Sequence, residues 1–516
     1  MAIWVLSWEL SETTAFTTRP TSNGSSLRRS FPTTQTTSAT TTTACYSTIQ
    51  HDVNNVVLRP TTAESLSTSL ATSSTSTTTT AASMKDSQDD DTATTATSSS
   101  SSSFEDIFDS FQIGSPIVHR YKSISSVLET TIEEDYDGTN YVMWYHGRSI
   151  IQDTETNKEE NSNDDVLLPP LSTGRIGRAV SRNGLIFQKD TKGATGEDIA
   201  GVALGLNNES WWGFDTAHVG LGSVLLPMTT PAVMTEGGIY LMYYFGGNYE
   251  ETNISLYSNN PAIPSEAKIK GMTMRIGVAV SQDGETWGRV EGDHPTNACM
   301  VPYDKSDPSS AMSDDNEQEF DSKNLVEELY CAWPEVVVQI VDESDTANAN
   351  KRGRFGLGGG SNNNAANTGD EKSGFFMYYS TMTKDTKTKA IAYAVSEDGF
   401  RWFKRGLCIQ PETTTAIAAT DNDNVDNDTP FDDDGCARCN VVRNASYNEL
   451  EETWSDSPGY TMYYEGVWTK DKKHRILSAQ STDGKIWTKN KNEIVLNIGS
   501  SESWDCDGVG SPHILR

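Results

Sequence analysis

The stretch SQDGETW, residues 281–287, decides the fold because the chain repeats it. Copies read SEDGFRW at 396–402 and STDGKIW at 481–487, and a divergent copy reads SRNGLIF at 181–187. Asp-Gly supplies the positive φ of a tight hairpin turn, and the Ser can bond the turn backbone. A residue set needed in every copy is scaffold, so we interpret Asp283, Asp398 and Asp483 as turn residues and not as catalytic acids.

Two runs typical of strands precede each copy. The nearer run reads RIGRAV (175–180), RIGVAV (275–280), AIAYAV (390–395) and RILSAQ (475–480). The farther, aromatic run reads YVMWYHG (141–147), YLMYYFG (240–246), FFMYYST (375–381) and YTMYYEG (460–466). A third run lies farther upstream, at 109–120, 215–226, 330–338, 432–443 and 505–516. Short β-branched and aromatic runs bounded by turn residues favour strands.

The repeating unit is therefore strand, aromatic strand, strand, Asp-Gly turn, and a fourth strand that begins at the Trp. Four short antiparallel strands per repeat form a propeller blade. The chain holds four complete units and a fifth first strand, which predicts an all-β, five-bladed β-propeller over 104–516. We expect blades near 109–190, 212–290, 320–405, 431–490 and 504–516. The last of these is partial, which favours a truncated chain.

The first 103 residues differ in kind. Thr and Ser dominate from Thr13 to Ser103. Such a segment cannot bury enough apolar area to offset its ordering entropy, so we predict that residues 1–103 are disordered. Up to Met84 the segment has four Arg and no Lys, which partly suits a plastid or mitochondrial targeting peptide. A plain low-complexity tail is the alternative.

The composition argues against several partners. The formal net charge is -32, and such an acidic surface repels phosphate backbones, so we expect no nucleic-acid binding. No stretch approaches the about 20 apolar residues of a membrane span, so we expect no membrane partner. The seven cysteines form no disulfide framework, and the lone pair Cys436 and Cys439 is a weak metal signal. We expect neither a metal nor another cofactor.

Strand phrases such as YLMYYFGG (240–247) and the turn phrase SQDGETW, with five blades implied, resemble a known group of proteins. It is the five-bladed β-propeller superfamily of arabinanases, levansucrases and invertases, which comprises glycoside hydrolase families 32, 43, 62 and 68. The resemblance covers residues 104–516. It implies a carbohydrate ligand and, in an active member, hydrolysis of a glycosidic bond. It also implies three carboxylates near the inner ends of first strands: a base or nucleophile, an orienting Asp and a general acid.

This chain departs from the acidic motifs of that superfamily. Where Asp-Pro is common in the family, blade one reads Ser115-Pro116 and blade two reads Leu221-Gly222. In blade three, Trp333-Pro334 stands where the family has Gly-Pro or Cys-Pro after a Glu, and here a Glu follows instead, as Glu335. Two carboxylates must flank a glycosidic bond, one to deliver a proton while the other attacks or activates water. The family's acids therefore do not carry over position by position.

Alignment of the five first strands with one another selects other candidates. One column reads Ser115, Leu221, Trp333, Arg438 and Ser511, and a second reads Ile117, Ser223, Glu335, Asn440 and His513. First strands line the central channel of a propeller, where ligands bind. Glu335 is the only carboxylate in either column, and we predict it as the general acid. The alternative is a buried Glu335 paired with Arg438. Trp333, Arg438 and His513 are predicted substrate contacts.

Two aspartates that lie just before first strands are the predicted bases. Asp109 and Asp215 share a column with Asp432 and Asp505, and this repetition makes a structural role the alternative. Beside Asp215, the pair Trp211 and Trp212 can stack on sugar rings or, alternatively, plug a gap between blades. His218 and Glu465 complete the predicted substrate contacts. His218 is alternatively a satisfied turn histidine.

Two functions follow from this sequence. The first is a glycosidase acting on a furanoside or other plant or algal glycan, with Glu335 as acid and Asp109 or Asp215 as base. The second is a non-catalytic propeller that binds a glycan or a protein, which the missing Asp-Pro and Glu-Gly-Pro motifs favour. A metal-dependent enzyme built on Cys436, Cys439 and nearby acids is a minor third hypothesis.

Overall fold

The computed structural model describes residues 108–122, 139–149, 173–190, 199, 201–226, 238–259, 261, 264–311, 324–338, 374–412, 430–448, 453–491 and 493–515. Within these ranges the helical elements are two short 3-10 helices, η6 (Ile254–Leu256) and η7 (Pro308–Ala311), and the rest is strand and turn. None of the helices in these ranges has the length and apolar character needed to cross a membrane. The segment predicted to be disordered, residues 1–103, lies outside the described residues.

Four antiparallel groups of strands, each called a sheet below, follow one another along the chain, and one parallel bridge between Lys389 and Gly435 joins the third to the fourth. The first holds β1 (Gln112–Lys122), β2 (Thr139–Arg148), β3 (Arg175–Ser181), β4 (Gln188–Lys189) and β5 (Val202–Leu204). The second holds β6 (His218–Leu225), β7 (Tyr240–Gly247), β10 (Arg275–Ser281) and β11 (Gly288–Val290). The third holds β12 (Glu328–Val338), β13 (Phe375–Thr383), β14 (Lys389–Ser396) and β15 (Phe403–Ile409). The fourth holds β16 (Gly435–Asn448), β17 (Thr453–Val467), β18 (His474–Ser481) and β19 (Thr488–Lys489).

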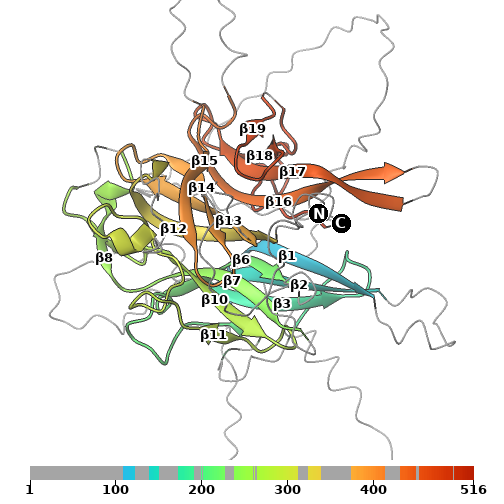
Figure 1. Ribbon diagram of the computed structural model, residues 1–516, viewed down its shortest axis with the longest axis horizontal. Helices are drawn as coiled ribbons and strands as arrows, with labels where there is room; N and C mark the ends of the chain where they lie inside the picture. The colour runs from blue at the N-terminus through green and yellow to red at the C-terminus, as the bar shows by residue number, and fades with distance from the viewer. Residues whose placement is uncertain are drawn as a thin grey trace, which may run out of the picture.

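The sheets surround one axis, so the described chain is an all-β propeller (Figure 1). Strand β6 lies against β1 and β12, and β12 lies against β16. A ribbon of β8 (Glu251–Asn253) and β9 (Lys268–Lys270) lies between β7 and β10 in sequence. Residues 509–515 belong to no sheet, yet they contact both β16 and β1: Asn440 accepts from Ile514 N, and Val118 N donates to His513. Four complete sheets and one further first-strand segment therefore surround the axis.

The repeated turn phrase closes the third strand of each sheet onto its fourth. Ser281 Oγ accepts hydrogen bonds from Asp283 N and Gly284 N, at 3.3 and 2.8 Å. Asp283 Oδ1 accepts from Glu285 N and Thr286 N, at 2.8 and 2.9 Å. The same bonds recur around Ser181, Ser396 and Ser481. The predicted scaffold role of this phrase is confirmed.

The turns of the second, third and fourth sheets also receive a hydrogen bond from the aromatic second strand of the sheet before them. Trp144 Nε1 donates to Gly284 O, Tyr243 Oη donates to Gly399 O, and Tyr378 Oη donates to Gly484 O, at 3.0, 3.0 and 2.6 Å. The Trp of the turn packs edge-on against the same aromatic ring, as Trp402 does against Tyr243, at 5.7 Å between ring centroids. One repeated phrase therefore both closes a blade and fastens it to its neighbour.

Changing Tyr378 to Phe is expected to lower the free energy of unfolding by about 1–2 kcal/mol, because Gly484 O loses its buried donor. Tyr463 is at the position in β17 that Tyr378 has in β13. Among the described residues, no fifth copy of the turn phrase follows to accept a hydrogen bond from it. Tyr463→Phe is therefore the matched control and should change stability by less. Urea denaturation of both variants measures the difference, and equal losses would refute the fastening role.

Candidate functional site

The first strands are irregular where they reach the axis. Their pairing shifts register between Gly114 and Ile117, Leu221 and Ser223, Ala332 and Glu335, and Ala437 and Cys439. Within three of these shifts, Ser115, Trp333 and Arg438 have positive φ values of 46°, 50° and 21°. Ser511, in the fifth segment, which belongs to no sheet, has a φ of 50°. A residue other than Gly held there costs about 1–3 kcal/mol, and such strain clusters at functional sites.

A small cavity lies at these bulges, on the axis. All five first-strand segments line it, through side chains that include Ser115, Trp333, Glu335, Arg438 and Ser511. Its volume is about 30 Å³. One water needs roughly 10–15 Å³ measured in this way, so the cavity holds a water or two or a group of similar size. A sugar ring does not fit inside it, and only a substituent of a sugar can enter.

Glu335 is the carboxyl group of this cavity. Its Oε1 accepts hydrogen bonds from Asn440 Nδ2 at 2.7 Å and from Val441 N at 3.2 Å. Burial outweighs these two bonds and raises the pKa of Glu335 to about 8. The group is therefore mostly protonated at neutral pH, which is the state that a general acid needs.

Arg438 pairs with Glu465 and not with Glu335, so the alternative that joined Glu335 to Arg438 is wrong. Arg438 Nη1 lies 3.3 Å from Glu465 Oε1, and the guanidinium carbon lies 4.6 Å from the centre of the Trp333 ring. His474 Nδ1 lies 2.8 Å from the other oxygen of Glu465. Burial alone would raise the pKa of Glu465, but Arg438 and His474 hold it below its usual value. Glu465 is fully buried within this network.

The polar column that contains Glu335 joins neighbouring first strands. Each of its polar side chains accepts from a backbone N–H of the next segment: Ser223 from Val336, Glu335 from Val441, Asn440 from Ile514, and His513 from Val118. The distances are 3.1, 3.2, 2.9 and 3.1 Å. His513 is thus placed in a contact between segments, and Glu335 shares this role with three residues that are not acids.

Asp109 and Asp215 lie in a three-residue arrangement that recurs in every complete sheet. Tyr145 Oη and Lys189 Nζ lie 2.9 and 2.6 Å from Asp109 Oδ2. In the next sheet, Tyr244 and Arg289 bond Asp215 Oδ2 in the same way. The third and fourth sheets repeat the arrangement with Glu328, Tyr379 and Lys404, and with Asp432, Tyr464 and Lys489. Both aspartates are buried, and this recurrence favours the structural alternative for them.

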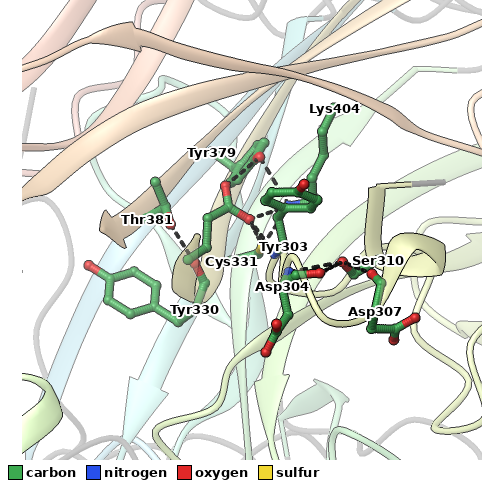
Figure 2. A network of polar contacts seen from close by, with 10 residues as sticks. Tyr303, Asp304, Asp307, Ser310, Tyr330, Cys331, Tyr379, Thr381 and Lys404 are labelled. Atoms are coloured by element: carbon green, nitrogen blue, oxygen red, sulfur yellow. Dashed lines mark hydrogen bonds and ion pairs between the residues drawn. The ribbon is translucent and has the colours of Figure 1, made fainter. Parts of the chain in front are cut away.

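The three-residue arrangement of acid, Tyr and cation has a second mark in the sequence, besides the Asp column. The cation always stands two residues after the aromatic residue of the turn phrase, as Lys189, Arg289, Lys404 and Lys489 do. Glu328 did not appear in the Asp column because it lies five residues before Trp333, whereas Asp215 lies six residues before Leu221. Figure 2 shows Tyr379, Cys331 and Lys404 gathered at this point of the third sheet.

Trp211 and Trp212 are exposed, by 85% and 47%, with their rings at 5.9 Å and nearly perpendicular. The alternative in which the pair plugs a gap between blades is therefore wrong. Phe111 comes just before β1, and the two tryptophans come before β6. Tyr249 follows β7, which runs antiparallel to β6 and ends where β6 begins. These exposed aromatic residues therefore lie at the end of the ring where the first strands begin.

His218 is placed differently from the tryptophans that precede it. It is buried, and its Nε2 lies 2.8 Å from Gly271 O. Burial lowers the pKa of His218 to about 4, so the imidazole is neutral. The contact with Gly271 favours the structural alternative over the substrate contact, although Nδ1 of His218 has no hydrogen-bond partner among the described residues.

The described residues contain no group of three or more His, Cys, Asp and Glu that could hold a metal ion. Cys436 is buried, with its Sγ 3.5 Å from Asp432 Oδ2, and burial raises the pKa of this thiol well above its usual value. A protonated thiol is a poor metal ligand.

No protein-family model matches the chain, and no curated protein matches it. Solved structures similar to it include a complex of BT0996 with RGII, at 14% identity and a TM-score of 0.38, covering 79% of this chain and 81% of that one. A glycosyl hydrolase from Bacteroides ovatus has 12% identity and a TM-score of 0.38, with 78% and 77% covered. Sucrose-6-phosphate hydrolase from Lactobacillus gasseri has 8% identity and a TM-score of 0.32, with 70% and 46% covered. Proteins described as glycosyl hydrolase and sucrose-6-phosphate hydrolase are thus among the solved structures to which this chain is similar.

Proposed function

We propose that the protein is a carbohydrate-active propeller that binds a glycan at the end of the ring where the first strands begin. The exposed pair of Trp211 and Trp212 is the observation that carries the proposal. The C–H faces of sugars pack well on aromatic rings, and large exposed apolar patches mark binding surfaces. Phe111 and Tyr249 add aromatic surface to the same end.

The reaction that the axial cavity favours is cleavage of a glycosidic bond with Glu335 as the general acid. Glu335 lines the axial cavity and holds a proton at neutral pH because burial raises its pKa. No second carboxylate lines the cavity among the described residues, so we assign no base. The substrate class expected from the sequence resemblance, a furanoside or other plant or algal glycan, remains part of this proposal.

Glycan binding without hydrolysis is the second candidate. The observation that favours it is the hydrogen bond from Val441 N to Glu335 Oε1, which gives the carboxyl group a role in the ring itself. Ser223, at the same position of β6, accepts the equivalent hydrogen bond from Val336 N and has no acidic group.

The test that separates the two candidates uses Glu335→Gln in the full chain, on aryl glycosides and on plant and algal polysaccharides. The amide keeps an oxygen for Val441 N and Asn440 Nδ2 but has no acidic proton. Hydrolysis by the wild type that falls at least about 100-fold in the variant supports Glu335 as the acid. Binding by both proteins without turnover supports the second candidate. Equal turnover by both proteins excludes Glu335 as the acid.

Replacing Trp211 with Ala is expected to weaken glycan binding about tenfold or more, because a sugar loses its stacking surface. Ile186→Ala is the matched control: Ile186 is 75% exposed and lies in the turn phrase of the first sheet, at the opposite end of the ring. Isothermal titration with the polysaccharide that binds best compares the variants. An unchanged affinity in Trp211→Ala would remove the observation on which the proposal depends.

A further inference from the structure

The axial cavity presents hydrogen-bond donors from several first-strand segments. The hydroxyl oxygens of Ser115 and Ser511 lie 3.2 Å apart, and Arg438 Nη1 donates to Ser511 Oγ at 3.0 Å. Glu335 lines the same cavity, and its neutral carboxyl is a further donor. Trp333 and three prolines complete much of the wall. The polar side chains at this point can thus all donate to a bound group.

Arg438 is the cation of the cavity wall, and its guanidinium is also ion-paired with the buried Glu465, at 3.3 Å. His146 is buried and pairs in register with Gly114, next to Ser115. Burial lowers the pKa of His146 well below its usual value, and the charges of Arg148, Arg438 and Arg175 lower it further. Burial and the nearby Arg438 also lower the pKa of Arg148, to about 10.

We propose that the axial cavity is an oxyanion site in which Ser115, Ser511 and Arg438 hold either a free inorganic oxyanion or the acid group of an anionic glycan. Charge-assisted hydrogen bonds from a guanidinium and hydroxyls are the contacts that carboxylate, sulfate and phosphate prefer. The volume suits one such group and excludes the sugar ring that carries it. The glycan form of this inference rests on the proposed function, whereas the inorganic form does not.

The test is isothermal titration of the full chain at pH 7 and constant ionic strength. The probes are inorganic phosphate, inorganic sulfate, glucuronate and glucose. We expect a saturable signal in the millimolar range for at least one anion and none for glucose. Phosphate or sulfate without glucuronate identifies a free anion as the ligand, and glucuronate bound more tightly identifies the acid group of a glycan. The absence of saturable binding by any anion would overturn the proposal.

The variant that assigns the site is Ser115→Ala combined with Ser511→Ala. Removing both hydroxyls should weaken anion binding at least about tenfold, because each hydrogen bond to a charged group contributes strongly. Ser223→Ala is the control, since Ser223 is a buried serine of a first strand that bonds Val336 N and does not line the cavity. Equal affinity in the double variant and the control would overturn the assignment.

The variant Trp211→Ala separates this inference from the proposed function. It should leave the binding of phosphate unchanged, because Trp211 is exposed and does not line the cavity. If the wild type binds phosphate but no glycan, the oxyanion site is supported and the proposed function is rejected. If Ser115→Ala with Ser511→Ala fails to fold, Arg438→Lys keeps the charge but loses the planar fork, and its affinity for phosphate should fall.

Discussion

Replacing Lys404 with Met is expected to lower the free energy of unfolding by about 3–5 kcal/mol, because it leaves the Glu328 carboxylate buried without its cation. Lys404 Nζ lies 2.5 Å from Glu328 Oε2, 3.1 Å from Tyr379 Oη and 3.2 Å from Cys331 Sγ (Figure 2). The side chains of the ion pair are 1% and 3% exposed. Water therefore cannot replace the ammonium group.

Lys189→Met provides the matched control, because Lys189 makes the same contact with Asp109 in the first sheet. The side chain of Lys189 is 22% exposed, so water reaches the vacated position and the loss should be smaller. Adding Glu328→Gln to Lys404→Met removes the stranded charge and should recover part of the stability. Guanidinium denaturation of the three variants gives the comparison. Equal losses in Lys404→Met and Lys189→Met would contradict the role of burial.

Glu335 is expected to make the protein less stable as the pH rises from about 5 to about 8. Burial raises the pKa of Glu335 from 4.5 to about 8 in the folded chain. Across that window the unfolded chain has released this proton and the folded chain has kept it. The free energy of unfolding then falls with pH, by up to about 1.4 kcal/mol per unit for this one group. Below about pH 4.5 both states hold the proton, and the dependence disappears.

The measurement is the difference in unfolding free energy between the wild type and Glu335→Gln at several pH values. The amide cannot titrate, so the free energy of unfolding of the variant should rise relative to that of the wild type as the pH rises, by several kcal/mol over the window. Ser223→Ala is the control for the same contact in β6, and its difference from the wild type should not change with pH. A flat difference for Glu335→Gln would mean that the folded protein holds Glu335 ionised.

The parts of the fold that the sequence could predict are those with local causes. Asp-Gly in a turn and alternating aromatic strands depend on neighbours along the chain, and they recur visibly at 281–287 and its copies. The roles of Glu335, Asn440 and His513 depend on contacts 74 to 395 residues away. The sequence therefore cannot distinguish a polar residue that contacts a ligand in the channel from one that bonds the backbone of the next strand.

The candidate site was accessible to sequence analysis only in part. Repetition alone raised the structural alternative for Asp109 and Asp215, because the recurrence of a column is visible in the sequence. The pairing of Arg438 with Glu465 was not visible, because it depends on how β16 pairs with β17, and the same carboxylate also lies 2.8 Å from His474 on β18. Exposure likewise separates Trp211 from the buried Trp402, although both are large aromatic residues in a polar context.

The ring has one seam that differs from its other joints. Between residues 511–514 and β1, the contacts are made by the side chains of Ser511 and His513, which meet Ser115 and Val118 across 396 and 395 residues of chain. Closing so long a loop costs entropy that no local contact offsets in advance, so this joint forms late during folding. We expect the native ring to open first at the same joint, and amide proton exchange at Val118, whose N–H donates to His513, to detect that opening before the sheets themselves unfold.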